Sequence, residues 1–144
     1  MSSIRAITLL YLVTLAVIPL ARGAGQLTNQ PPVASIVRFE AARMPPKGAV
    51  WRALPRQDGE FILSSLHGLQ EWHPKWPGDG VIGCMLPPPN DFSVLAITKS
   101  GKEYEVTFTT RAELVWVGSR LLEVPGPTST QIVQRVERVL KQKR

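Results

Sequence analysis

The stretch DFSVLAITKSGKEYEVTFTT, residues 91–110, decides the fold of this chain. Residues 92–98 and 103–110 are rich in β-branched and aromatic types, which suit the pleated surface of a strand. Between them, the pair Ser100-Gly101 is a turn signal, because glycine adopts positive φ without strain. The pattern predicts a β-hairpin with a two-residue loop.

The alternation of side chains predicts how the two strands pair. In this register Ile97 faces Tyr104 and Leu95 faces Val106 on a mostly apolar face, and the glutamates and threonines of the second strand face water. A shift of one residue would turn the carboxylates toward the core, so the pattern favours this pairing.

More strands are expected on both sides of the hairpin. Residues 113–118 and 120–124 have strand composition, and residues 125–127 (Pro-Gly-Pro) then end the pairing, because proline lacks the N–H that a ladder needs. Upstream, residues 33–41 alternate as a strand does, and residues 49–54 are predicted to form another.

The C-terminal segment has a strong helical pattern. Thr128 and Gln131 match a capping box after Pro127, so a helix is expected to begin near Thr128. Its apolar residues form one stripe at helical spacing: Ile132, Val133, Val136, Val139 and Leu140. The stripe is aliphatic, which favours packing on the sheet over binding to a lipid or cell-wall surface. The expected fold class is α+β, with an antiparallel sheet (a meander over residues 92–124 plus the N-terminal strands) covered by this helix.

Residues 60–72 fit two structures. Their apolar residues follow helical spacing: Phe61, Ile62, Leu63, Leu66, Leu69 and Trp72. The alternative is a hairpin that turns at Asp58-Gly59, with residues 60–66 as its second strand. The helix is preferred, although Gly68 within the pattern counts against it.

The N-terminal segment resembles a signal peptide in its composition. Arg5 supplies a positive charge, residues 6–18 are uncharged and mostly apolar, and small residues precede an expected cleavage after Gly23. Only sixteen uncharged residues separate Arg5 from Arg22, fewer than the roughly 20 that span a bilayer. A cleaved signal is therefore favoured over a membrane anchor.

These observations divide the chain into a signal peptide (residues 1–23), a flexible leader (24–32) and a single α+β domain (33–144). The formal net charge is +6, and residues 135–144 carry five basic residues against one acidic. This concentration complements the C-terminal end of a helix dipole and lacks the basic stripe of a nucleic-acid binder, so no nucleic-acid partner is expected.

An aromatic loop contains the candidate binding residues: Trp72, His73, Lys75, Trp76 and Asp79. Two prolines and two glycines exclude regular structure there. The tryptophans could stack on a sugar ring or anchor a protein partner, because tryptophan is enriched at binding hot spots. The competing interpretation, given more weight, is that both rings fold back as a cap on the core.

No chemical motif accompanies this loop. His67, His73, Asp79 and Cys84 are metal-ligand types, but their spacing matches no zinc pattern, so no metal or cofactor is expected. Cys84 is the one cysteine, and its apolar neighbours in residues 81–86 predict a buried, unreactive thiol in a strand. No catalytic residue is assigned.

The expected function is therefore binding. The chain is expected to be an exported, non-enzymatic protein, periplasmic or secreted, that presents the Trp72–Trp76 loop to a protein or glycan of the cell envelope. One alternative is a small extracytoplasmic hydrolase that gathers His73, Asp79 and a glutamate in one cleft. Another is a structural component of an envelope assembly, contacted through the basic residues 141–144.

Overall fold

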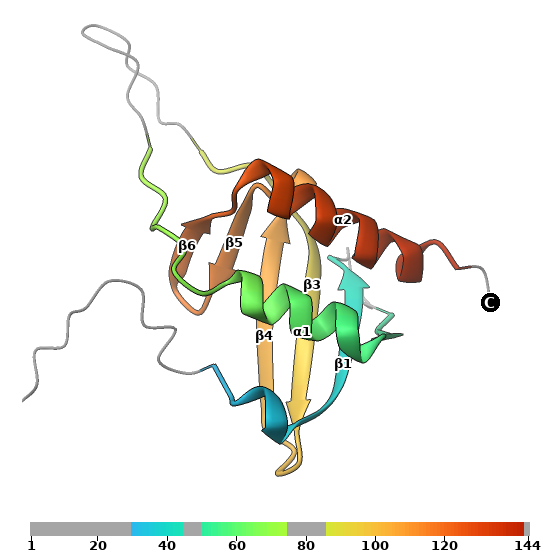
Figure 1. Cartoon of the computed structure of the whole chain (residues 1–144). Helices are drawn as coiled ribbons and strands as arrows, with labels where there is room; N and C mark the ends of the chain where they lie inside the picture. The colour runs from blue at the N-terminus through green and yellow to red at the C-terminus, as the bar shows by residue number, and fades with distance from the viewer. Residues whose placement is uncertain (1–29, 45–49, 75–85, 143–144) are drawn as a thin grey trace, which may run out of the picture.

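The computed structural model describes residues 30–44, 50–74 and 86–142, which form one antiparallel sheet with two α-helices (Figure 1). In chain order the elements are η1 (Val33–Ser35), β1 (Ile36–Arg43), β2 (Arg52–Leu54), α1 (Arg56–Ser65), β3 (Asn90–Thr98), β4 (Glu103–Thr109), η2 (Thr110–Ala112), β5 (Leu114–Val117), β6 (Arg120–Glu123) and α2 (Gly126–Leu140). The strand order is β2-β1-β3-β4-β5-β6. The predicted α+β fold is confirmed, including the meander β3–β6 and the covering C-terminal helix.

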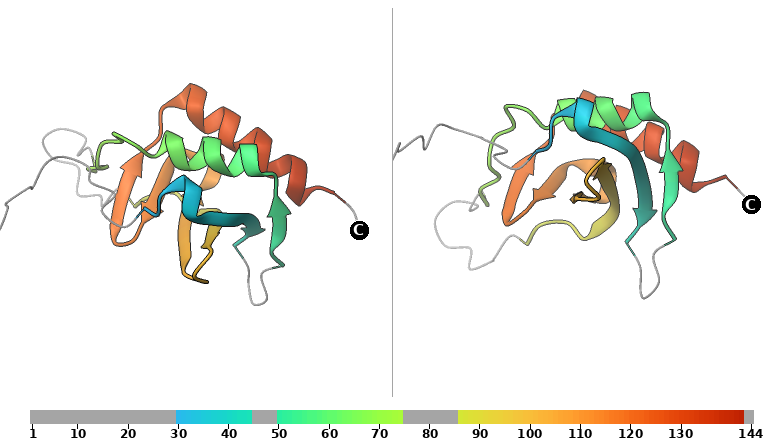
Figure 2. Two further views of the ribbon diagram at one scale, coloured as in Figure 1. Left: turned by 60° about the horizontal axis from the view of Figure 1, so that its bottom comes forward. Right: turned by 90° about the horizontal axis from the view of Figure 1, so that it is seen from below.

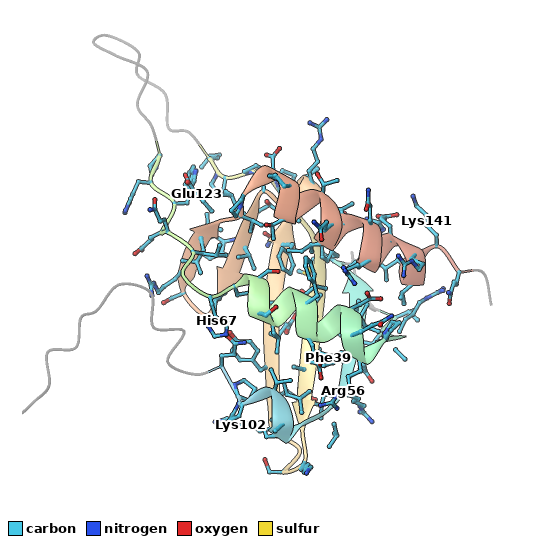
Figure 3. The ribbon with its side chains drawn as sticks, in the orientation of Figure 1. Phe39, Arg56, His67, Lys102, Glu123 and Lys141 are labelled. Carbon is cyan, nitrogen blue, oxygen red and sulfur yellow. The ribbon has the colours of Figure 1, made fainter. Side chains whose placement is uncertain are left out.

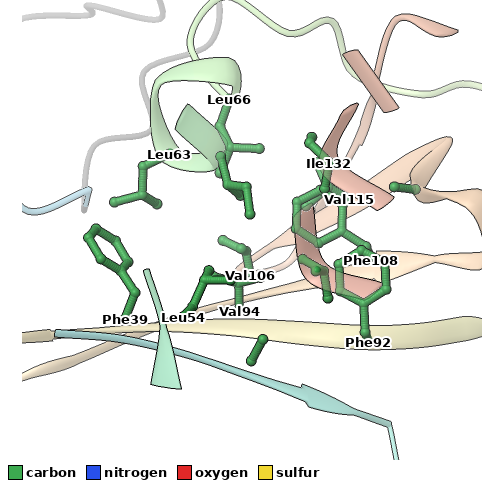
Figure 4. Packing of buried hydrophobic residues seen from close by; sticks show 14 of the residues in the cluster. Phe39, Leu54, Leu63, Leu66, Phe92, Val94, Val106, Phe108, Val115 and Ile132 are labelled. Atoms are coloured by element: carbon green, nitrogen blue, oxygen red, sulfur yellow. The ribbon is translucent and has the colours of Figure 1, made fainter. Parts of the chain in front are cut away.

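Both helices lie on the same side of the sheet, next to each other over its concave face (Figure 2). The strands alternate between this inner face and the outer face that points away from the helices. Side chains of the inner face and both helices form the core, in which the rings of Phe92 and Phe108 stack at 5.0 Å (Figure 4). The stripe of α2 is buried here as expected, at Ile132, Val136 and Val139.

The register of the central hairpin differs from the prediction by one residue. Ile97 pairs with Glu103, and Ala96 pairs with Tyr104. The loop has three residues: the Thr98 amide donates to the Lys102 carbonyl at 2.9 Å, and Gly101 has a φ of +80°. A three-residue loop with glycine in the left-handed region is a common hairpin connection.

The physical reason for the wrong register is that β3 is apolar on both faces. Phe92, Val94 and Ala96 point to the core, and Leu95 and Ile97 lie on the outer face, where they are nevertheless 7% and 8% exposed. Burial of apolar side chains therefore does not choose between the two registers of β3, and the loop geometry decides. The prediction for β4 was right, because its glutamates face outward.

Residues 56–65 form α1, so the helix is confirmed over the hairpin for residues 60–65, whereas residues 66–72, which continue the helical spacing, lie outside the helix. Position 59 requires glycine because α1 packs closely on β1: a Cβ at this position would lie 2.1 Å from the Phe39 ring. Gly68, which counted against the helix, lies beyond its end with a φ of +72°. There it suits the chain reversal that follows many helices.

The prediction that a capping box at Thr128 begins the C-terminal helix is wrong. The helix begins at Gly126, and no side chain caps it. Pro127 is tolerated in the first turn because the N–H that proline lacks would have no partner there. The buried Asp58 carboxylate ties α1 to α2 through Arg135 at 2.5 Å, and Arg135 also lies over the Phe61 ring at 4.2 Å.

Several predictions fall outside the described residues. The signal peptide of residues 1–23 and most of the leader are among them. So are the binding candidates Lys75, Trp76 and Asp79, and the expected strand around Cys84. These expectations stay predictions.

Candidate functional site

The edge strand β6 is extended by residues 70–72, which bring Trp72 to the sheet. Glu71 forms a bridge with Leu122, the Trp72 amide donates to the Leu121 carbonyl at 2.8 Å, and the Glu123 amide donates to the Gln70 carbonyl at 2.8 Å. Glu71 lies opposite the core residue Leu122, so alternation places Trp72 on the outer face.

Trp72 thus lies in a row of side chains that crosses the outer face from strand to strand. The register joins Leu121 to Trp116, Trp116 to Thr107, Thr107 to Ser93 and Ser93 to Ala42. Trp72 and Trp116 flank the buried Leu121, and both tryptophans are half-buried. Because neighbouring strands are about 4.8 Å apart, the backbones of the two tryptophans are roughly 10 Å apart. We call Trp72, Leu121 and Trp116 the aromatic row.

The aromatic row is separate from the main core. The core cluster includes Leu122 and Val115, which face the helices, but neither Trp72 nor Trp116. Trp72 therefore lies outside the core cluster between the sheet and the helices, and the expectation that both tryptophan rings cap the core stays a prediction, because Trp76 is outside the described residues. His73 follows Trp72 and is exposed. Of the five predicted binding residues, these two are the ones that the described part of the chain places.

The outer face changes character along the strands. Toward the β3–β4 loop, Leu95 is flanked by Glu40 and Glu105, and Ile97 is flanked by Arg38 and Glu103. With Glu123 on β6, the outer face of the six strands carries four carboxylates and one guanidinium: Arg38, Glu40, Glu103, Glu105 and Glu123.

Most of these carboxylates are open to a partner. Arg38 pairs with Glu40 at 3.3 Å. Glu103, Glu105 and Glu123 are exposed and form no ion pair with any described residue. We call Glu40, Glu103 and Glu105 the acidic end of the outer face.

A pocket of about 590 Å³ lies beside the β3–β4 loop, where it is lined by Pro31, Pro32, Ser35, Thr98, Lys99, Ser100, Lys102, Glu103 and Tyr104. Three of its hydroxyl groups bond within the protein: Ser35 donates to the Pro32 carbonyl at 2.7 Å, and Thr98 bonds to Ser100 at 3.0 Å. The buried Tyr104 hydroxyl has no hydrogen-bond partner among the described residues, and burial raises the pKa of this phenol. Lys99, Lys102 and Glu103 add three exposed charged residues to the lining.

The described residues hold no group of three or more histidine, cysteine, aspartate or glutamate side chains that could bind a metal ion. Within the same ranges, no helix has the length and hydrophobicity needed to cross a membrane. Comparison with protein-family models, curated proteins and solved structures found no match. The structure thus defines a class by architecture: an α+β domain whose sheet has helices on one face and an aromatic row on the other.

Trp116 is the site residue that the sequence reasoning missed. It was placed on a strand of the meander, but its face was left unassigned. No alternation of polar and apolar residues singles it out, because its neighbours Val115 and Val117 are apolar as well. Its link to Trp72 depends on the bridge between residues 71 and 122, for which the sequence gives no local signal.

Proposed function

We propose that this chain is an exported, non-enzymatic binding protein that contacts a protein or glycan through the aromatic row. The observation that carries the proposal is the pair of half-buried tryptophans on the sheet face opposite both helices. Tryptophan combines a large contact area with few rotatable bonds, which makes it the residue type most enriched at binding hot spots.

The backbone supports a preformed surface. Trp116 of β5 pairs with Leu121 of β6, and the Trp72 backbone is attached to β6 by a hydrogen bond to the Leu121 carbonyl. Ladder hydrogen bonds restrict the three backbones, so little conformational entropy is lost when a partner binds. His73, exposed next to Trp72, adds a hydrogen-bonding group at the rim.

Site-specific photo-crosslinking in the native cell tests a protein partner. A benzoylphenylalanine at position 123, exposed on the outer face, should give crosslinked adducts, whereas one at position 57, exposed on α1, should not. Trp72→Ala should abolish the adducts at position 123. Equal adducts at both positions, or adducts that survive Trp72→Ala, would contradict the proposal for proteins.

Calorimetry with a panel of hexasaccharides tests a glycan partner. Binding that is lost in Trp72→Ala and in Trp116→Ala would support stacking on the aromatic row, and the circular dichroism of each variant shows whether it folds. If neither crosslinking nor calorimetry depends on these tryptophans, the proposed function is wrong.

Export is the second half of the proposal. It rests on the charge, apolar core and small residues of the segment 1–23. Mass spectrometry of the protein from its native cell should find a chain that begins at Ala24 in the periplasm or medium. An intact segment on protein from the cytosol would overturn this part.

A further inference from the structure

We infer that the partner of the outer face is a cationic polypeptide segment, in which apolar side chains are followed by lysine or arginine. This inference rests on the proposed function and adds the chemistry of the partner. Its basis is that the outer face has two ends of different character along the same strands: the aromatic row and the acidic end.

The distance between the aromatic row and the acidic end determines how far apart the apolar and basic residues of the partner should be. The row of Thr107, which contains Trp116, lies two residues along β4 from Glu105 and four residues from Glu103. At about 3.4 Å per residue, these carboxylates are roughly 7 and 14 Å from Thr107 along the strand, and β4 lies one strand away from Trp116. An extended peptide that runs obliquely from β5 to β4, with an apolar residue on Trp116, would therefore bring side chains at the second and fourth following positions to the acidic end.

Charge favours a cationic partner over the other classes. On the six strands, four carboxylates against the guanidinium of Arg38 give the outer face a net negative charge, and the exposed Lys99 and Lys102 lie beyond the strands at the β3–β4 loop, beside Glu103. This charge attracts lysine and arginine and disfavours phosphate groups, which excludes nucleic acid and anionic lipid as good partners. A neutral glycan gains no attraction from this net charge, so stacking on the tryptophans and hydrogen bonds would have to hold it.

A second copy of this chain is a poorer occupant. The described basic residues of α2 and its C-terminal end lie on the helix side of the sheet, where Arg135 and Arg138 are close to Asp58 and Lys141 (Figure 3) pairs with Glu137 at 2.9 Å. An acidic outer face that binds the helix side of another copy is a heterologous contact, which propagates into open chains unless it closes into a ring. Self-association is therefore a competing outcome of the test.

Fluorescence anisotropy with synthetic peptides provides the test. The probe is a peptide of about twelve residues that repeats Leu-Ser-Lys-Ser-Lys-Ser, so that each leucine and the two lysines that follow it share one face when the peptide is extended. Matched peptides replace lysine by glutamate, or leucine by serine. The purified protein should bind the lysine–leucine peptide most tightly, and added salt should weaken this binding.

Variants of this protein distinguish the contribution of the carboxylates to peptide binding from that of the tryptophans. E103Q/E105Q should weaken the lysine–leucine peptide about tenfold, and E103K/E105K should reverse the preference toward the glutamate–leucine peptide. The control E60Q/E113Q removes two carboxylates outside the outer face, Glu60, which pairs with Arg56 at 2.7 Å, and the exposed Glu113, and should not change peptide binding. W72A/W116A should weaken binding about thirtyfold.

The outcomes distinguish the two proposals. If W72A/W116A loses binding but E103Q/E105Q and E103K/E105K behave like the native protein, the aromatic row binds a partner and the inference of a cationic one is wrong. If the native protein binds no lysine–leucine peptide but binds hexasaccharides through Trp72, the inference fails and the proposed function stands. Salt-sensitive self-association that E103Q/E105Q abolishes would assign the outer face to a second copy and overturn the inference.

Discussion

The two faces of the sheet are made by the same strands, yet they differ in what covers them. The inner face is covered by α1 and α2, and Phe39 and Phe108 on it are 2% and 0% exposed. The outer face has its own row of large side chains, but Trp72 and Trp116 keep part of their surface in water. Leu95 and Leu121 of the outer face are also buried, so the difference between the faces lies in the two tryptophans and the glutamates, which keep part of their surface accessible to a partner.

The largest expected effect compares one aromatic residue from each face. Phe108→Ala should lower the free energy of unfolding by about 3–5 kcal/mol, because it removes a fully buried ring that stacks on Phe92. Trp116→Ala removes a larger side chain but should cost only about 1–2 kcal/mol, because Trp116 is half-buried. Urea denaturation followed by circular dichroism measures both.

An equal loss in the two variants would break the comparison. The outer face would then be a second core, and its tryptophans would be retained for stability. A smaller loss for Trp116→Ala, combined with unchanged spectra, keeps the residue available as a binding anchor.

The second prediction concerns how closely α1 approaches the sheet. Gly59→Ala should cost about 1–3 kcal/mol, because the new methyl group would overlap the buried Phe39 ring and force the helix or the ring to move. Gly126→Ala in α2 is the matched control, since no atom lies within 4 Å of its added Cβ. The control should stabilise the protein by about 0.4–1 kcal/mol.

Thermal unfolding of the two glycine variants checks this contrast. If Gly59→Ala is as stable as the native protein, the contact between α1 and the inner face is looser than the structure shows. The inner face would then resemble the outer face more than we infer.

The sequence predicted the composition of each face better than the pairing of the strands. The alternation of Glu103, Tyr104 and Glu105 placed β4 correctly, because only one of its faces is apolar. The same reasoning failed for β3, where Leu95 and Ala96 suit either face and the loop at Gly101 sets the register.

The site was harder to predict than the fold. Trp72 was selected as a candidate from its residue type and loop, but the same residue also completed the predicted helical pattern, whereas the structure places it beyond the end of α1, beside β6. Its position beside Leu121 depends on a bridge between residues about fifty apart in the chain, and one sequence carries no local signal for such a contact. Trp116 was hidden within a strand whose two faces are both mostly apolar.

The smallest expected effect concerns the edge of the inner face, where α2 meets β1. Glu137 bonds to Lys141 at 2.9 Å and to Arg43, which also pairs with Asp91 at 2.8 Å. The bond from Lys141, followed by that from Arg43, lowers the pKa of the Glu137 carboxyl below its ordinary value of 4.5, although burial acts in the opposite direction. The folded protein thus keeps this carboxyl ionised at a pH where the unfolded chain binds a proton.

The stabilisation from Glu137 should therefore be complete above about pH 4.5 and disappear as the pH falls through the lowered pKa. Glu137→Gln should cost about 1 kcal/mol or less at pH 7, because Arg43 and Lys141 are 47% and 75% exposed. Melting temperatures from pH 7 down to pH 3 should show the difference between variant and native protein shrinking in acid. Lys141→Gln removes one donor and should reduce this pH dependence. A difference that stays constant over the whole range would mean that charge does not hold α2 to the inner face, and that apolar packing at Ile132 and Val136 suffices.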